Sequence, residues 1–338
     1  LIYENNMLVF SIESSCDESS VCIMDDKKHI YSHIIFSQDI HKKFGGVVPE
    51  LASRAHLEIL QKITTIAIKE SKIKIQDIDI FAATCGPGLI GALLIGSTFA
   101  KSLSIGCKKP FMPINHLKGH VLSPSFNNQI TYPHLSLLLT GGHTQIYLID
   151  KRQNIKLIGE TVDDALGEAF DKIAKILNLK YPGGPEIELN ARNGNGLSFK
   201  LPTPLLDKHS LDMSFSGIKT AVNLLVKKNI VNDVFISDIC ASFQFCITKI
   251  LLEKTSRAIK NLKMKSINVS SISIVGGVAN NKYIIDNFSN FVENNNIKLF
   301  LPHKEMRSDN AAMIAWACLN EKIDAKNIFF KANPRLTV

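Results

Sequence analysis

The sequence lacks several features that would place it in a familiar class of protein. Its seven cysteines are an odd number and include no Cys-x-x-Cys pair, which excludes a disulfide framework and a zinc knuckle. No stretch supplies the ~20 unbroken apolar residues of a membrane span, because the longest candidate, residues 88–106, is interrupted by Ser97, Thr98, Lys101 and Ser102. The N-terminal residues carry no basic side chain, as a signal or transit peptide would. These absences predict a soluble, cytoplasmic protein without membrane contact.

Arginine is also scarce, with six residues against 33 lysines. Together, 39 basic and 31 acidic side chains give a formal net charge of +8, which suits an anionic partner such as RNA. Because isoleucine and asparagine abound as well, the lysine excess is typical of a nucleotide-composition bias, and charge alone favours nucleic acid only weakly. The 338 residues are 45% hydrophobic, which excludes disorder and predicts two domains with their own cores.

Two blocks of the chain repeat one pattern of strand, polar turn, strand, tight turn and strand. The strands are expected at residues 7–13, 20–25 and 30–37, and again at 135–139, 145–150 and 155–160. Helices are expected to follow each block, at 49–71, 91–106, 164–177 and 236–262. The duplication predicts two related α/β lobes, residues 1–132 plus 312–338 and residues 133–311, with a cleft between them. Such a pair resembles the ribonuclease H-like architecture of actin, Hsp70 and sugar kinases, in which two turns embrace the phosphates of a nucleotide.

Two histidines, His116 and His120, follow the apolar strand expected at 111–114. On a helix their four-residue spacing puts both imidazoles on one face, close enough to share a metal ion. The alternative is two unrelated surface histidines. A zinc protease would need a glutamate directly after the first histidine as general base, and Leu117 occupies that position. Proteolysis by a bound metal is therefore disfavoured on mechanism.

Two glycine-rich turns, residues 140–144 and 276–281, follow predicted strands. Backbone amides that glycines leave accessible, with a helix N-terminus behind the second turn, bind phosphate or ribose oxygens well. Tight turns need glycine in any case, so each turn is weak evidence alone, and only the two together in a duplicated fold favour a nucleotide site. Neither matches Gly-x4-Gly-Lys-Ser/Thr, which excludes an ordinary P-loop enzyme.

Acidic residues gather at three places. Asp17 and Glu18 lie in the first polar turn, a second group surrounds the helix expected at 164–177, and Asp309 precedes the last helix. Asp164 and Asp309 are placed to cap helices and need no further function. Asp171 is harder to explain structurally, because it lies in the middle of an amphipathic helix that leads into the stiff loop Tyr-Pro-Gly-Gly-Pro.

Eight segments in order along the chain carry a resemblance to one family. They are residues 11–18, 45–54, 86–89, 116–120, 163–172, 182–185, 214–217 and 308–311. Through them the sequence resembles the bacterial branch of the tRNA N6-adenosine threonylcarbamoyltransferases (TsaD/Gcp, formerly called O-sialoglycoprotein endopeptidase), from about residue 7 to residue 335.

The resemblance implies a tRNA-modifying activity. The enzyme would transfer the threonylcarbamoyl group from threonylcarbamoyl-adenylate to N6 of the adenosine 3′ of the anticodon (position 37) in tRNAs reading ANN codons, releasing AMP. It also implies two bacterial partner proteins, a TsaB-like paralogue and a TsaE-like P-loop ATPase, which we expect to dock near helical residues 50–70.

The resemblance also implies the site residues. His116, His120 and Asp309 would hold one divalent metal ion, Fe²⁺ in the first place with Zn²⁺ as the alternative. The residues that would line the adenylate site are Leu138, Leu139, Thr140, Gly141, Gly142, Asp171, Gly184, Glu188 and Asn281. Asp17 and Glu18 are the candidates to take a proton from the attacking amine. At the position of Leu138, archaeal and eukaryotic relatives carry a tyrosine that is a further metal ligand, and a leucine cannot bind a metal ion in its place.

Three other functions compete with this prediction. A sugar-kinase-like ATP phosphotransferase would share the fold, but the sequence carries no identifiable sugar-binding set. A metal-dependent glycoprotein endopeptidase would lack its general base. A non-catalytic scaffold in a tRNA-modifying complex would not need the complete ligand set that the chain retains.

Overall fold

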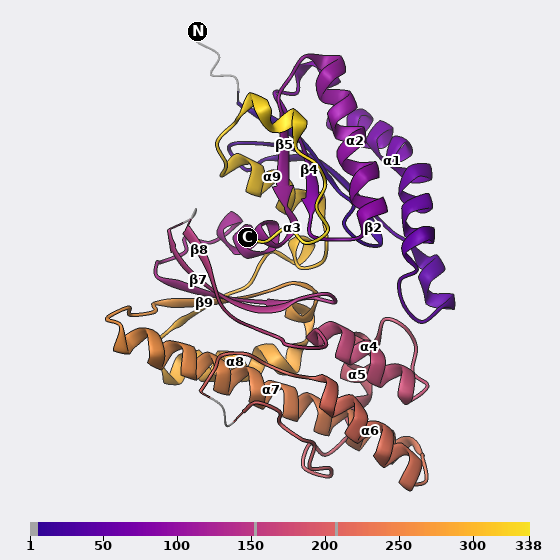
Figure 1. The fold of residues 1–338 in the computed structure, drawn as a ribbon, viewed down its shortest axis with the longest axis vertical. Coiled ribbons are helices and arrows are strands. Elements are labelled where there is room, and N and C mark those ends of the chain that lie inside the picture. Colours follow the sequence, from indigo (N-terminus) through magenta and orange to yellow (C-terminus); the bar gives the residue numbers. More distant parts are fainter. Residues whose placement is uncertain (1–5, 152–153, 207–208) are drawn as a thin grey trace. The chain divides into compact units, whose positions relative to one another are not determined.

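A computed structural model describes residues 6–151, 154–206 and 209–338, so most of the N-terminal segment considered for a signal peptide lies outside the described residues. The chain divides into two compact units. Unit 1 comprises Leu1–Asn127 and Pro302–Val338, and unit 2 comprises Asn128–Leu301. Each unit contains one five-stranded sheet with helices packed on it (Figure 1).

Unit 1 has the strand order β3-β2-β1-β4-β5. Its strands are β1 (Leu8–Glu13), β2 (Glu18–Asp25), β3 (Ile30–Ser37), β4 (Ile80–Gly86) and β5 (Phe111–Asn115). β1 is antiparallel to β2 and parallel to β4. Its helices are α1 (Pro49–Ser71), α2 (Ile90–Cys107), α3 (His116–Leu122) and α9 (Ala311–Leu319). The 3₁₀ helices are η1 (Asp39–Lys43), η2 (Ile75–Asp77), η3 (Ser123–Phe126), η5 (Lys304–Met306) and η6 (Ala325–Phe329).

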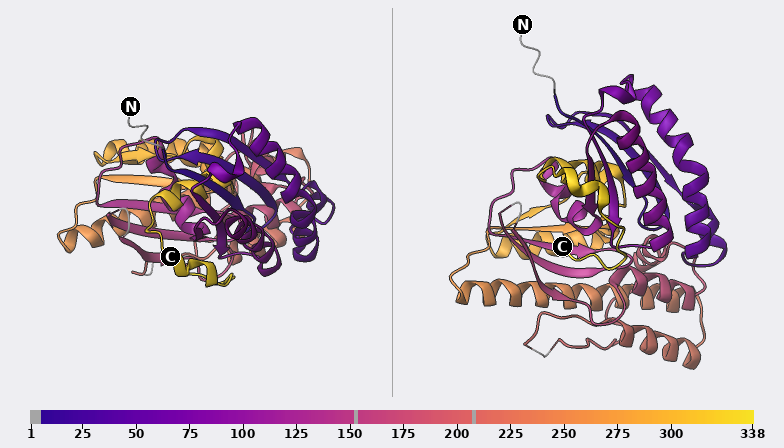
Figure 2. Two further views of the ribbon diagram at one scale, coloured as in Figure 1. Left: turned by 90° about the horizontal axis from the view of Figure 1, so that it is seen from above. Right: turned by 45° about the horizontal axis from the view of Figure 1, so that its top comes forward.

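The alternation of side chains along β1 determines which helices cover each face of this sheet. Phe10 and Ile12 lie in one buried cluster with residues of α1 and α2. Ser11 points to the opposite face and donates a hydrogen bond of 2.7 Å to the carbonyl oxygen of Ala311, at the start of α9. Therefore α1 and α2, which lie side by side in Figure 2, cover one face, and α9 covers the other.

Unit 2 repeats this arrangement with the strand order β10-β9-β6-β7-β8. Its strands are β6 (His134–Leu139), β7 (Thr144–Lys151), β8 (Asn154–Glu160), β9 (Ser271–Val275) and β10 (Lys298–Phe300). β6 is antiparallel to β7 and parallel to β9, as β1 is to β2 and β4. Its helices are α4 (Leu166–Ile176), α5 (Gly183–Ala191), α6 (Ser216–Lys228), α7 (Asp233–Met264), α8 (Lys282–Asn294) and the 3₁₀ helix η4 (Gly277–Asn280).

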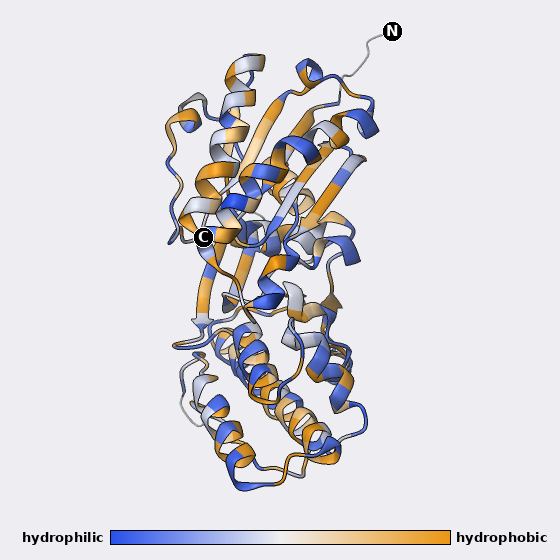
Figure 3. Ribbon diagram, turned by 90° about the vertical axis from the view of Figure 1, so that its right-hand side faces the viewer, coloured by the Kyte–Doolittle hydropathy of each residue, from blue (hydrophilic) through white to orange (hydrophobic). Residues whose placement is uncertain are grey.

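The duplicated α/β fold is therefore confirmed, because the first three strands of each unit pair in the same order and directions. Apolar residues of the strands and helices, coloured orange in Figure 3, build the two cores. Side-chain caps start some of the helices: Asn232 accepts a hydrogen bond from the amide of Phe235 and starts α7. α9 is capped by Asn310 and not by Asp309, and α4 begins without the expected cap from Asp164.

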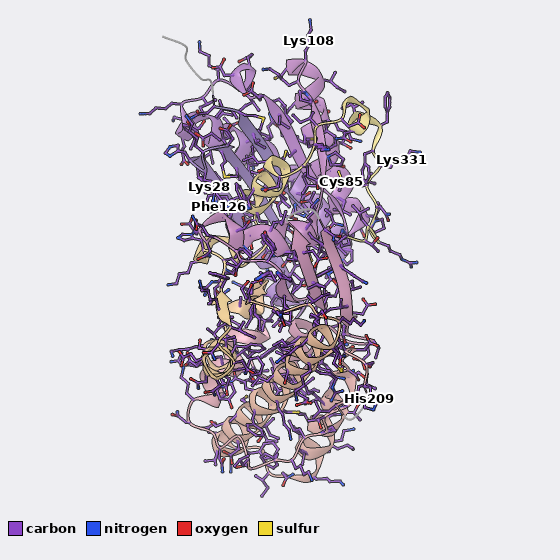
Figure 4. All side chains as sticks on the ribbon, turned by 90° about the vertical axis from the view of Figure 1, so that its left-hand side faces the viewer. Lys28, Cys85, Lys108, Phe126, His209 and Lys331 are labelled. Atoms are coloured by element: carbon purple, nitrogen blue, oxygen red, sulfur yellow. The ribbon has the colours of Figure 1, made fainter. Side chains whose placement is uncertain are left out.

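The units differ from the expected lobes at both boundaries: unit 2 begins at Asn128 rather than at residue 133, and the C-terminal segment joins unit 1 from Pro302 rather than from residue 312. The contacts of α9 explain the second difference. Lys28, labelled beside Phe126 in Figure 4, donates a hydrogen bond of 2.6 Å to the carbonyl oxygen of Phe126. Its ammonium also lies 4.8 Å from the centre of the Trp316 ring, which ties α9 to the rest of unit 1. The residues that lead into α9 contact unit 1 as well, because Asp309 lies 3.0 Å from His120 and the amide of Ala311 donates to the hydroxyl of Ser20.

Two helices, α2 and α7, are long and apolar enough to cross a membrane by length and composition alone. This test weighs mean hydropathy and charge, whereas our expectation concerned ~20 unbroken apolar residues, so the finding does not contradict the expectation. Two-thirds (67%) of the most apolar window of α7 is buried in unit 2, as in the core helix of a soluble protein. α2 packs against β4 and α1, and 33% of its apolar window is buried in unit 1.

One buried lysine fixes a long connection in unit 2. Lys254, on α7, is fully buried, and its ammonium donates hydrogen bonds to the carbonyl oxygens of Leu205 (2.7 Å) and Ser210 (2.9 Å). Burial lowers the pKa of Lys254, and the nearby charge of Arg257 lowers it further. The two hydrogen bonds tie the segment before α6 to the middle of α7.

Replacing this lysine should therefore destabilise unit 2. We expect Lys254→Met to reduce the free energy of unfolding by about 2 kcal/mol, because the carbonyl oxygens of Leu205 and Ser210 lose the charged donor that the buried lysine supplies. Lys260→Met, at an exposed position of the same helix, is the matched control and should change stability little. Urea unfolding followed by circular dichroism measures both, and equal midpoints would contradict the role of Lys254.

Candidate metal centre and nucleotide site

The predicted metal ligands come from two elements of unit 1. His116 begins α3 directly after β5, where the side chain of Asn115 caps the helix by accepting a hydrogen bond from the amide of Lys118. His120 follows one turn later, and Asp309 lies just before α9. The structure brings the three together: one potential ligand atom from each lies within 4.8 Å of the others.

The geometry and donor types fit a cation. Oδ1 of Asp309 lies 3.0 Å from Nε2 of His120 and 3.6 Å from Nε2 of His116, so both imidazoles face one carboxylate. Nδ1 of His120 is buried and has no hydrogen-bond partner among the described residues. Two imidazoles and one carboxylate form a donor set that suits Fe²⁺ and is also found around Zn²⁺.

Sequence reasoning missed the residue behind these ligands, Glu13 at the end of β1. Its fully buried carboxylate lies 3.0 Å from Nδ1 of His116 and accepts hydrogen bonds from the amide of Ser15 (2.6 Å) and the hydroxyl of Thr84 (2.5 Å). Burial alone would raise the pKa of Glu13, but attraction to His116 and the hydrogen bonds bring it below the ordinary value. A carboxylate in this position orients a metal-binding histidine.

The same negative charges act on His116. Burial would lower the pKa of this imidazole, but the charges of Glu13 and then Asp309 outweigh burial and raise it to about 9. The centre therefore favours a positive charge, and a divalent ion would compete with the proton for it.

The acidic turn before β2 lies close to this centre. Glu18 opens β2, and its pKa is raised by burial and by the charges of Asp309 and Asp17. The turn is held from α1: Nε2 of the buried His56 lies 2.9 Å from the carbonyl oxygen of Cys16 and donates to it. Both predicted proton acceptors thus belong to the surroundings of the metal ligands in unit 1.

In unit 2, the two glycine-rich turns adjoin each other. The first connects β6 to β7, where the amide of Thr140 donates to the carbonyl oxygen of His143 (2.9 Å). The second follows β9, and a Cβ added to Gly276 would lie 2.5 Å from the carbonyl oxygen of Leu139. Gly276 also has a φ of +92°, so only glycine fits there without strain.

The glycines on the outer side of these turns are open. A Cβ on Gly141, Gly142, Gly184 or Gly277 would meet no atom within 4 Å. The start of α4 closes the inner side, because the amide of Gly167 donates to the carbonyl oxygen of Thr140 (3.1 Å). Leu138 and Leu139 are buried at the end of β6 and supply backbone rather than side chains to this region.

The polar residues predicted for the adenylate site each have a partner within unit 2. Asp171 accepts a hydrogen bond from the amide of Gly183 (2.7 Å), which orients the start of α5. Glu188 accepts from the amide of Lys282 (2.8 Å). Asn281 caps α8 through the amide of Ile284 and donates to the side chain of Gln244 (2.7 Å). These contacts hold α4, α5 and α8 around the two glycine turns.

Solved structures identify the fold class. The chain is similar to HypF from T. kodakarensis (TM-score 0.63, 12% identity, covering 96% of this chain and 49% of that one). It is also similar to component A of the (R)-2-hydroxyglutaryl-CoA dehydratase of Acidaminococcus fermentans (TM-score 0.51, 16% identity, 93% and 96%). These likenesses and the two sheets place the chain among proteins with the actin-like ATPase fold.

Sequence comparison then identifies the family. The model described as "TsaD: tRNA N6-adenosine threonylcarbamoyltransferase" matches residues 29–316. A protein of that name from Thermosipho africanus is 50% identical over 317 residues, covering 92% of this chain and 93% of the relative. Another, from Rickettsia peacockii, is 47% identical over 315 residues, with 92% of each chain covered. The chain therefore belongs to the tRNA N6-adenosine threonylcarbamoyltransferase family, which confirms the predicted family and makes it a transferase.

Removing either histidine should empty the metal centre. We expect His116→Ala and His120→Ala each to lose most of the bound divalent metal while the fold is kept, because two ligands alone hold a cation weakly. The exposed His303→Ala, also in unit 1, is the control. Elemental analysis of protein purified without oxygen measures the metal, and unchanged content in both variants would refute this ligand set.

A side chain at Gly277 should obstruct the nucleotide. Because a Cβ there meets nothing within 4 Å, Gly277→Leu should fold normally and project into the space that a phosphate would approach. We expect AMP affinity to fall about tenfold, which corresponds to about 1.4 kcal/mol. Calorimetry compares it with Gly106→Leu, whose Cβ position is equally open but lies on α2. Equal affinity in the two variants would place the nucleotide elsewhere.

Proposed function

We propose that this chain transfers the threonylcarbamoyl group from threonylcarbamoyl-adenylate to N6 of the adenosine 3′ of the anticodon, position 37, in tRNAs reading ANN codons. The observation that carries the proposal is the group of two buried histidines, His116 and His120, with the half-buried Asp309 and with Glu13 behind His116, in a chain 43–50% identical to relatives named for this transfer. In the reaction the amine attacks the carbamoyl carbon, the bond from that carbon to the phosphate oxygen breaks, and AMP leaves.

The main requirement of this reaction is to neutralise the negative charge that develops on the departing AMP. A divalent ion, Fe²⁺ in our proposal with Zn²⁺ as the alternative, would neutralise that charge when held by the two histidines and Asp309. Glu13 fixes the orientation of His116 through the hydrogen bond to its Nδ1. Its charge also keeps the histidine basic, which favours cation binding.

The AMP part of the donor would bind at the two glycine turns of unit 2. The amides of Gly141, Gly142 and Gly277 would bind phosphate oxygens, because all three residues are exposed and a Cβ on any of them would meet no atom within 4 Å. Asp171 would accept hydrogen bonds from ribose hydroxyls while its contact with Gly183 holds it in place. Leu138, Leu139, Thr140, Gly184, Glu188 and Asn281 complete the proposed lining.

The attacking amine must lose a proton. We assign this to the Asp17–Glu18 turn, because burial and the neighbouring acids raise the pKa of Glu18 and make its carboxylate a stronger base. His56 supports the turn by donating to the carbonyl oxygen of Cys16.

The competing functions find less support in these residues. A metal-dependent endopeptidase of the His-Glu-x-x-His type would need a glutamate directly after the first histidine, and Leu117 occupies that position. A sugar-kinase-like phosphotransferase shares only the fold. A scaffold without activity would have no use for three converging ligands backed by a buried carboxylate.

For the partners we propose tRNA, a TsaB-like paralogue and a TsaE-like P-loop ATPase, in the cytoplasm. α1 supports the docking surface expected near residues 50–70, because apolar side chains there are exposed, Leu57 by 70% and Ile66 by 44%. α2 lies beside it and adds Leu94 and Ile105, also exposed. Exposed apolar side chains on two adjacent helices are typical of a surface that a partner protein covers.

The test is a modification assay. With threonylcarbamoyl-adenylate, the bacterial partners and unmodified tRNA, the wild-type protein should form threonylcarbamoyladenosine and AMP. We expect His116→Ala and Asp171→Ala to lower the initial rate by about tenfold or more, whereas Lys27→Ala, on an exposed turn, should keep it. Nucleoside analysis of the tRNA measures the product. Full modification by His116→Ala, or cleavage of casein without any tRNA product, would overturn the proposal.

A further inference from the structure

A pocket of about 420 Å³ lies between α4 and α6 of unit 2, outside the metal centre and the glycine turns. We call it the lysine pocket, and its lining residues are Lys172, Lys175, Ile176, Lys219, Thr220 and Asn223. Half of these residues are lysines and none is acidic. Its volume is in the range of pockets that hold small organic ligands.

The positive charge in this pocket is only partly neutralised. Lys172 forms ion pairs with Asp164 (2.7 Å) and Glu168 (2.8 Å). Lys175 and Lys219 form no ion pair with any residue in the described ranges. Two lysine charges from different helices therefore face one space without a carboxylate between them, an arrangement that a bound anion stabilises.

The walls of the pocket favour an anion that also carries an apolar or aromatic body. Lysine side chains line a surface with their methylene stems and place the ammonium at the rim, and Ile176 adds a further apolar wall. Thr220 and Asn223 contribute a hydroxyl and an amide, which donate hydrogen bonds to phosphate or sugar oxygens. A nucleotide unit of a single-stranded nucleic acid has this combination of charged phosphate, polar sugar and flat base.

The pocket has a fixed geometry because Asp163 holds the first turn of α6. Its carboxylate accepts hydrogen bonds from the hydroxyls of Ser214 (2.5 Å) and Ser216 (2.7 Å) and from the amide of Phe215 (2.8 Å). Lys219 follows one turn later on the same helix. The segment 214–217, which the proposed transfer leaves without a role, thus positions one wall of the pocket.

The pocket is also close to the proposed nucleotide site. Asp171 and Lys175 lie four residues apart on α4, so their side chains share one face of the helix. An acceptor adenosine that reaches a donor bound at Asp171 must bring its neighbouring nucleotides past α4. Sequence-selective proteins commonly bind RNA through single-stranded loops of this kind, in which bases are splayed outward.

We propose that the lysine pocket binds the phosphodiester backbone of the acceptor tRNA, with Lys175 and Lys219 contacting phosphate groups. The inference rests on the proposed function for the identity of the RNA. Lys175 and Lys219 then bind tRNA and take no part in holding the AMP of the donor.

The experiment compares Lys175→Ala, Lys219→Ala and the double variant with Lys260→Ala, an exposed lysine of α7 in the same unit. Fluorescence anisotropy measures the Kd for unmodified tRNA at a series of KCl concentrations, and calorimetry measures the Kd for AMP. We expect each pocket variant to weaken tRNA binding roughly fivefold and to reduce the slope of log K against log salt by about one. Lys260→Ala should change neither value, and AMP affinity should stay at the wild-type level throughout.

Arginine variants at the same positions separate loss of charge from loss of folding. Lys175→Arg and Lys219→Arg keep the positive charge and should retain tRNA binding within about twofold. If the double alanine variant keeps the tRNA affinity and the salt slope of the wild type, the lysine pocket does not bind tRNA. Loss of AMP binding with tRNA binding intact would overturn the proposal too, because the pocket would then hold the donor.

The two proposals fail in distinguishable ways. Wild-type protein that binds tRNA through these lysines but forms no threonylcarbamoyladenosine would overturn the proposed transfer and support the pocket as an RNA site. If the wild-type protein modifies tRNA, and if replacing both lysines changes neither the rate of modification nor the tRNA affinity, the pocket alone is overturned.

Discussion

The buried carboxylate of Glu13 is the interaction on which the chemistry of unit 1 depends. It joins the end of β1 to Thr84 on β4, to the amide of Ser15 in the acidic turn and to His116 at the start of α3. Burying a charge is costly unless its hydrogen bonds are satisfied, and here three donors satisfy it. The remaining negative charge orients His116 and, together with Asp309, makes the centre attractive to a cation.

Unit 2 is organised by a different constraint, the close approach of backbone to backbone. Gly167 allows α4 to begin against the turn at Thr140, and a Cβ there would lie 2.8 Å from the carbonyl oxygen of Thr140. Gly276 allows the turn after β9 to lie against the end of β6. These inner glycines are enclosed, whereas Gly141 and Gly277 are exposed and a Cβ on either would meet no atom within 4 Å. The two units thus provide different chemistry on related sheets.

Much of the fold could be predicted from the sequence. Alternating apolar runs with polar turns locate the first three strands of each unit to within two residues at their ends, as in β2, which starts at Glu18 rather than residue 20. The spacing of His116 and His120 alone indicates a shared face of α3. Asp309, 189 residues beyond His120, could be identified only through the family resemblance, because its position depends on how α9 packs against unit 1.

Other features could not be predicted because they depend on tertiary contacts. Glu13 and His56 lie within segments that show only strand or helix patterns, and their polar partners are far along the chain. The return of residues 302–311 to unit 1 depends on contacts of α9 with β1 and η3. Lys175 and Lys219 appear in the sequence as two of 33 lysines, and only the packing of α4 against α6 brings them to one pocket.

We propose that a cation held by His116, His120 and Asp309 drives the transfer of a threonylcarbamoyl group with release of AMP. The most direct test strips the wild-type protein with a chelator, adds Fe²⁺ back in steps without oxygen, and counts threonylcarbamoyladenosine and AMP in the same reactions with tRNA and partners. The account predicts that both products are absent from the stripped protein and return in equal amounts, levelling off at about one metal ion per chain. Full modification by the metal-free protein, or AMP release without modified tRNA, would contradict it.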